Sequence, residues 1–284
     1  MAAKDAKQKE APSLESIPGE LPLLPLRDLV LFPSAVLPIT IGRESSIALV
    51  NSLGENRFLG VVTQRDPHLD TPGPTDLHSI GSVGIIHKVV RMPNQSLFVF
   101  CEGIYRARVT EILAATPFLR ARLERVEETS VSTSPEIEAL RQNIISVFQQ
   151  IVAQSPSLSE DLHSIAVKIT EPGRLADFMA ASLPTLTSAE RQEVLAELDV
   201  RRRLDLILLK LAKELEVLQL RSKIQSSVQD QVSQSQREFY LREQMKAIQK
   251  ELGEGDEHQR DIEELRRKIE ARSEERRVGK ECRL

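Results

Sequence analysis

The stretch from Val200 to Leu252 contains neither glycine nor proline. Most of its residues are strong helix formers, so it predicts one continuous helix. Its second half carries apolar residues at steps of four, three and four, which we call the helix seam: Leu241, Met245, Ile248 and Leu252. This is the spacing of a coiled-coil seam. A helix this long needs a partner surface, either within its own chain or on another domain or subunit, and the sequence leaves these alternatives open.

The region 21–127 has a different pattern, in which short apolar runs alternate with turn residues. Prolines at 22, 25, 33 and 38 exclude a helix at its start. The expected strands are Phe58–Gln64, Gly81–Arg91, Leu97–Glu102, Tyr105–Leu113 and Phe118–Val126, with a short helix over Glu44–Asn56 and a break at Gly103. Short strands at this spacing predict a compact antiparallel β domain or a partly closed barrel.

Residues 134–199 switch to helical periodicity and predict a bundle, after a polar linker over 127–134. Ser134-Pro135 reads as the first helix start, and Pro172-Gly173 as the end of the second helix. Thr187 and Glu190 have capping-box spacing. The fold class is therefore α+β: a β domain, a helical bundle and a long coiled-coil-like helix.

The two ends of the chain predict little packed structure. Residues 1–20 are charged and rich in small residues, so we expect them to be disordered. Residues 256–271 resume the helical pattern, with Ile262, Leu265 and Ile269 spaced for an antiparallel return. Residues 272–284 are charged and aperiodic, and we interpret them as an atypical, artefactual end without functional weight.

No catalytic motif is present in the sequence. It lacks a phosphate-binding G-x-x-x-x-G-K-[ST] loop, a G-x-S-x-G elbow, an H-E-x-x-H pair and a C-x-x-C pair. Its five histidines are scattered, and its two cysteines, Cys101 and Cys282, lie far apart. We therefore predict no catalytic, cofactor-binding or metal-binding residue, and an inert core thiol at Cys101.

Two features suggest binding surfaces. Leu29, Phe32 and Pro33 in a proline-rich strand, with Met92 and Pro93 at a turn, are candidates for an apolar patch that contacts substrate. The competing interpretation, that they are turn and core residues, is favoured for each. Arg201–Arg203 suggests a nucleic-acid patch, but Asp199 and Asp205 flank it, which favours a solvated helix face with intrahelical ion pairs.

The composition limits the partners and the cellular compartment that we expect. A net charge of −4 gives no overall attraction to nucleic acid or anionic membrane. No apolar run approaches the roughly 20 residues that a membrane span needs, and the first residues lack the apolar core of a secretory signal. The sparse, separated cysteines favour a reducing compartment, so we expect a cytoplasmic protein.

Three segments carry a family resemblance: LLPLRDLVLFP from Leu23 to Pro33, IGRE from Ile41 to Glu44, and QREFYLREQMKAIQKEL from Gln236 to Leu252. The chain resembles the N-terminal region of the bacterial ATP-dependent protease Lon over roughly residues 21–271. The resemblance implies a PUA-like β domain and a helical bundle, then a long helix that leads into an AAA+ ATPase. A Ser-Lys serine protease domain lies beyond, in a cytoplasmic homohexamer that degrades damaged and short-lived regulatory proteins.

The sequence stops before the ATPase and protease motifs of that family, so no catalytic residue and no ATP or magnesium ligand can be carried over. We expect a substrate-recognition and assembly region that is itself inactive and binds unfolded or damaged proteins. An alternative is a stand-alone adaptor module, for which the segment Gln236–Leu252 would have no use. A nucleic-acid-binding module is a weaker alternative, because the net charge is negative.

Overall fold

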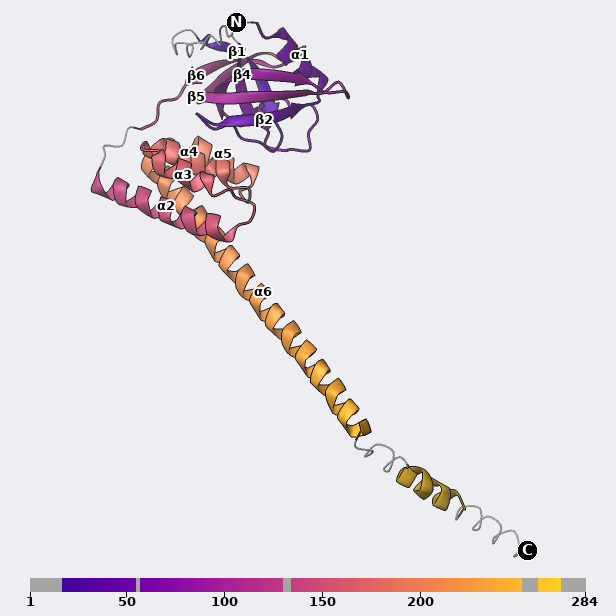
Figure 1. Ribbon diagram of the computed structural model, residues 1–284. Helices are drawn as coiled ribbons and strands as arrows, with labels where there is room; N and C mark the ends of the chain where they lie inside the picture. The colour runs from indigo at the N-terminus through magenta and orange to yellow at the C-terminus, as the bar shows by residue number, and fades with distance from the viewer. Residues whose placement is uncertain (1–16, 55–56, 130–133, 252–259, 272–284) are drawn as a thin grey trace, which may run out of the picture. The chain divides into compact units, whose positions relative to one another are not determined.

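The computed structural model describes residues 17–54, 57–129, 134–251 and 260–271 (Figure 1). It separates into two compact units, one up to Leu218 and one from Gln219 onward, which are described separately. The first unit holds a β domain and a helical bundle. The predicted tail 272–284, most of the predicted disordered segment 1–20 and Leu252 lie outside the described residues.

The β domain is a six-stranded sheet in the order β2-β5-β4-β3-β1-β6. Its strands are β1 (Glu20–Leu26), β2 (Val36–Ile41), β3 (Phe58–Thr63), β4 (Ile80–Arg91), β5 (Leu97–Ala114) and β6 (Arg120–Arg125). Because β5 also pairs with β6, every strand except β2 joins a closed ring, and β2 attaches to β5 outside it. The ring agrees with the predicted partly closed barrel.

The prediction of a purely antiparallel domain is wrong, because β1 and β3 run parallel. The chain between them is a crossover that contains β2 and the helix α1 (Glu44–Ser52), rather than a tight turn. Glu20 is already in β1, paired with Arg122, so the predicted disorder does not extend to residue 20. The predicted loop 65–79 contains one short 3-10 helix, η2 (Pro74–Asp76).

Gly103 does not break the strand around it, contrary to expectation, since β5 is continuous from Leu97 to Ala114. The glycine instead lets the backbone of Phe32 and Ser34 approach the strand closely. A Cβ atom at this position would lie 2.2 Å from the carbonyl oxygen of Phe32, which leaves no room for any side chain. The N–H of Ser34 donates to the carbonyl oxygen of Gly103 over 2.8 Å.

The bundle contains α2 (Pro135–Gln154), α3 (Asp161–Lys168), α4 (Pro172–Ser182) and α5 (Ser188–Ala196). Ser134 accepts a bond from the N–H of Ile137, and Thr187 and Glu190 form the expected capping box. Pro172 and Gly173 begin α4 rather than closing the helix before it, because proline fits the first helical turn, where its missing N–H costs no bond.

The bundle and the β domain share one apolar core. Val30, Phe32 and Ile80 of the β domain belong to the same buried cluster as the interior residues of α2, α4 and α5. The helix α6 (Val200–Glu251) completes the bundle with its first turns, where Leu204, Ile207 and Leu211 are fully buried. The two regions that the sequence divides are therefore packed together within the first unit.

In the second unit, the described residues are the later part of α6 and the helical stretch 260–271. The predicted continuous helix is present up to Glu251. Ile262, Leu265 and Ile269 are each more than half exposed. Their antiparallel packing against α6 stays a prediction.

Candidate functional site

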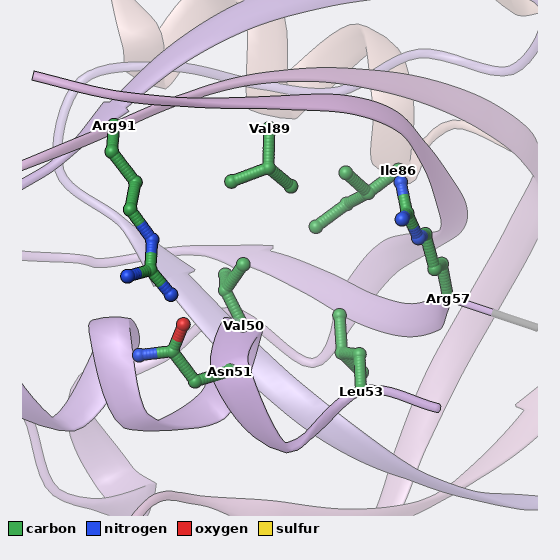
Figure 2. Close-up of a pocket in the computed structure, with 7 residues that line it drawn as sticks. All are labelled: Val50, Asn51, Leu53, Arg57, Ile86, Val89 and Arg91. Carbon is green, nitrogen blue, oxygen red and sulfur yellow. The ribbon is translucent and has the colours of Figure 1, made fainter. Parts of the chain in front are cut away.

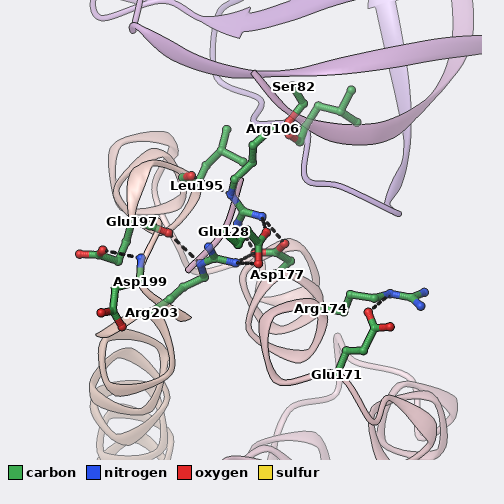
Figure 3. A network of polar contacts seen from close by, with 11 residues as sticks. Ser82, Arg106, Glu128, Glu171, Arg174, Asp177, Leu195, Glu197, Asp199 and Arg203 are labelled. Atoms are coloured by element: carbon green, nitrogen blue, oxygen red, sulfur yellow. Dashed lines mark hydrogen bonds and ion pairs between the residues drawn. The ribbon is translucent and has the colours of Figure 1, made fainter. Parts of the chain in front are cut away.

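A buried polar cluster joins the β domain to the bundle (Figure 3). We call it the interdomain cluster; its members are Arg106 of β5, Glu128 of the linker, Asp177 of α4 and Arg203 of α6. Arg106 donates from Nη1 to Asp177 Oδ2 over 2.8 Å and from Nη2 to Oδ1 over 2.5 Å. Arg106 also donates from Nη1 to Glu128, and Arg203 donates to Glu128 over 3.2 Å.

The cluster has equal numbers of cationic and anionic side chains, so its charges balance. The side chains of Arg106 and Arg203 are 1% and 0% exposed. Their Nε atoms donate to the backbone carbonyl oxygens of Leu195 and Glu197, over 3.0 and 2.8 Å. Buried charges persist only when they are paired and hydrogen-bonded in this way, so the cluster is a structural joint and not a reactive site.

The sequence interpretation of Arg201–Arg203 as a solvated face is correct for Arg201 and Arg202, which are exposed, and wrong for Arg203. Arg201 pairs with Glu136 over 2.6 Å and with Asp205 over 3.9 Å. Arg203 is instead buried in the interdomain cluster. Its position three residues after Val200 and four before Ile207 places it on the apolar stripe of α6, and this signal could have identified it.

One open groove lies between the end of α1 and β4, and we call it the α1–β4 groove (Figure 2). It has a volume of about 270 Å³ and is lined by Val50, Asn51, Leu53, Arg57, Ile86, Val89 and Arg91. Figure 2 shows Arg91 and Arg57 at its two ends, with the apolar side chains between them. The described residues of the lining include no acidic residue.

A second, larger groove of about 820 Å³ runs beside β1, β2 and the start of α1, and we call it the β1–β2 groove. Its volume is within the usual range of ligand pockets, roughly 300–1,000 Å³. Among its polar contacts, Arg27 pairs with Asp70 over 2.5 Å and Arg43 donates to the amide oxygen of Gln64 over 2.6 Å. Leu29, one of the predicted substrate contacts, lines it.

The five predicted substrate contacts do not form one patch. Phe32 is 1% exposed and belongs to the shared core, and Pro33 is half-buried beside Gly103. Met92 is 44% exposed and lies with Pro93 in the turn between β4 and β5. Along β5 this turn is about six residues from Gly103, roughly 20 Å. Contact of any of the five with a substrate stays a prediction.

The helix seam lies open in the second unit. Leu241, Met245 and Ile248 are 53%, 64% and 55% exposed. Leu252 lies outside the described residues. The sequence predicts that a partner surface covers the seam, and the structure does not test this.

The described residues show neither a metal-binding cluster nor a reactive cysteine. They contain no cluster of three or more His, Cys, Asp or Glu side chains that could hold a metal ion. Cys101 is buried, and burial, with a smaller contribution from Glu102, raises the pKa of its thiol to about 12. The thiolate needed for nucleophilic chemistry is therefore suppressed. Within the described part of the chain, no helix is long and apolar enough to cross a membrane.

Comparison with known proteins gives a consistent result. Residues 20–213 match the family model of the ATP-dependent protease La (LON) substrate-binding domain. The chain is 60% identical over 251 residues to Lon protease of Koribacter versatilis, covering 88% of this chain and 31% of that protein. It is 41% identical over 265 residues to Lon protease of Dictyoglomus thermophilum, covering 93% of this chain and 33% of that protein. The chain thus spans about a third of the length of these curated relatives.

A solved structure shows the same fold. The N-terminal domain of the Mycobacterium avium complex Lon protease aligns with a TM-score of 0.56 at 20% identity, over 68% of this chain and 98% of that one.

Proposed function

The chain belongs to the family of Lon (ATP-dependent protease La) substrate-binding domains, and from this premise we propose that it is the substrate-recognition and assembly region of a Lon protease. Its partners would be unfolded, damaged or short-lived regulatory proteins. The catalysis of the whole enzyme, an ATP-dependent serine endopeptidase that uses ATP and magnesium, would reside in domains that the described residues do not include.

The observation that carries this proposal is the pair of open grooves on the β domain. Both combine apolar side chains with charged or amide groups, which is the composition expected of a surface that binds polypeptide. Among the described residues that line them, no hydrogen bond joins a serine or threonine hydroxyl to a carboxylate or an imidazole.

Assembly is proposed from the helix seam. Its exposed members are Leu241, Met245 and Ile248, and a row of half-exposed apolar side chains at heptad spacing is stabilised by packing on another helix. We assign the seam to a contact with another domain or subunit of a homohexamer in the cytoplasm.

The binding proposal is tested with the full 284-residue chain. Fluorescently labelled, unfolded casein should bind without ATP and should stay uncleaved after prolonged incubation. A folded globular protein of similar size is the control and should not bind. If casein does not bind at any protein concentration below the one at which the chain associates with itself, the recognition role is wrong.

A further inference from the structure

One edge of β4 is open next to the α1–β4 groove. β4 pairs with β3 only as far as Ile85, which lies opposite Phe58. The N–H of Ile86 then donates to the carbonyl oxygen of Arg57 over 3.1 Å. From Lys88 to Arg91, the described pairing of β4 is with β5 alone. Among the described residues, this stretch therefore presents strand backbone without a neighbouring strand on its second side.

The hydrogen-bond alternation identifies which backbone groups face that edge. The N–H of Met92 donates to the carbonyl oxygen of Ser96 over 2.9 Å, so these two residues form a hydrogen-bonded pair. In an antiparallel ladder such pairs alternate with pairs that do not exchange bonds. Val89 and Arg91 are therefore in the second kind of pair, and their N–H and C=O groups point away from β5, toward the open edge.

The lining of the groove supplies side-chain selectivity. Between its ends lie Val50, Leu53, Ile86 and Val89, of which Val50 and Ile86 are 6% and 2% exposed. A volume of about 270 Å³ is below the usual lower limit of a small-molecule pocket, roughly 300 Å³. It suits one or two side chains of a longer occupant whose backbone lies outside the groove.

The charge of the groove selects the occupant further. Arg57 and Arg91 are exposed at its ends, and the part of the lining that the structure describes has no acidic residue. Arg57 has a φ of 46°, which is uncommon for a residue with a side chain. Its Nη1 donates to the carbonyl oxygen of His87 over 3.4 Å, which aligns the guanidinium with β4.

We propose that the α1–β4 groove binds an extended segment of unfolded polypeptide as an added strand on β4, with apolar side chains in the groove and a carboxylate facing Arg57 or Arg91. Strand addition obtains affinity from main-chain bonds and specificity from alternate side chains. An unfolded chain can present a whole extended segment of unpaired main-chain groups, whereas most main-chain groups of a folded protein are already paired, so this edge would favour unfolded chains. The inference rests on the proposed function and specifies its substrate class.

The probe is a fluorescein-labelled heptapeptide of alternating leucine and threonine with an aspartate at each end. Its binding to the full chain is measured by fluorescence anisotropy at low and high salt. A peptide with lysine at each end is the matched comparison. We expect the aspartate peptide to bind about threefold to tenfold more tightly at low salt, and the difference to shrink as salt screens the arginines.

Protein variants separate charge from strand addition. Arg91→Glu should weaken binding of the aspartate peptide and strengthen binding of the lysine peptide. Lys168→Glu, a reversal from positive to negative charge at an exposed residue of α3 in the bundle, should leave both affinities unchanged. Val89→Pro removes the N–H that faces the open edge and should weaken the binding of both peptides. Peptides N-methylated at alternate residues test the same bond without altering the protein, and only one of the two alternations should abolish binding.

Equal binding of both end-charged peptides, or of both N-methylated series, would overturn the inference. If casein binds the wild-type chain and the Arg91→Glu and Val89→Pro variants equally well, the recognition role holds and this groove is not its site. If casein fails to bind the wild-type chain at all, the proposed function itself fails.

Discussion

Arg106 on β5 and Asp177 on α4 form a two-bond ion pair, with N–O distances of 2.8 and 2.5 Å, in which both side chains are at least 96% buried. The pair connects a strand of the β domain to a helix of the bundle. Because Arg203 of α6 also lies 3.5 Å from Asp177, the base of the long helix is held at the same point. The interdomain cluster thus joins the β domain to the bundle and to the first turns of α6.

Removing Asp177 should leave two arginines buried without adequate compensation. We expect Asp177→Ala to lower the free energy of unfolding by about 3–5 kcal/mol, measured by urea denaturation. The double variant Arg106→Met/Asp177→Leu should lose less free energy of unfolding than the single variant, because neither charge of that pair remains. If the double variant is less stable than Asp177→Ala, the attraction within the ion pair stabilises the joint, and the cost of an unpaired buried charge is not the main effect.

Gly103 should tolerate no side chain. The Cβ atom of Gly103→Ala would overlap the backbone of Phe32, and we expect a loss of about 1–3 kcal/mol in the free energy of unfolding. Gly42→Ala is the matched control, since nothing lies within 4 Å of a Cβ atom there. Thermal denaturation of both variants measures the difference, and equal melting temperatures would contradict the close approach.

The capping box of α5 should make stability depend on pH. Hydrogen bonds from the backbone N–H and then the side chain of Thr187 lower the pKa of Glu190 below its ordinary 4.5. A carboxyl with a lowered folded pKa contributes stability that is full above the ordinary pKa and is lost as pH falls through the folded pKa. Urea titrations from pH 7 to pH 3 should show this loss in the wild type and a smaller loss in Glu190→Gln.

The helix seam should govern self-association. Met245→Glu places a charge on the seam and should reduce the fraction of oligomer in sedimentation velocity. The unfolding transition of the first unit should not change, because the side chain of Met245 is 64% exposed. Ala247→Glu adds the same charge two residues away, off the seam, and should leave association unchanged. Equal association of the two variants would remove the seam from the interface.

Local patterns predicted most elements because their causes are local. Ser134 and Pro135 begin α2 where expected, because a helix cap depends only on residues next to each other in the sequence. The predictions that were wrong depend on distant residues. Gly103 resembles a strand breaker until Phe32 is known to lie against it, and Pro172-Gly173 fits a helix end as well as a helix start.

The candidate site was less predictable than the fold. Leu29, Phe32, Pro33, Met92 and Pro93 are apolar, but apolar character alone does not indicate which residues the core takes. Phe32 is buried in the shared core, whereas Met92 is exposed. The arginines of the α1–β4 groove come from two segments more than 30 residues apart, and the open edge of β4 exists only because β3 begins opposite Ile85.

The sequence alone determined the helical continuity of Val200–Glu251, because glycine and proline act within a few residues of themselves. It also excluded the common catalytic motifs. Tertiary structure decided where β1 and β3 pair, which arginines are buried and where a strand edge stays open. Those outcomes depend on residues far apart in the chain, whose approach local patterns do not encode.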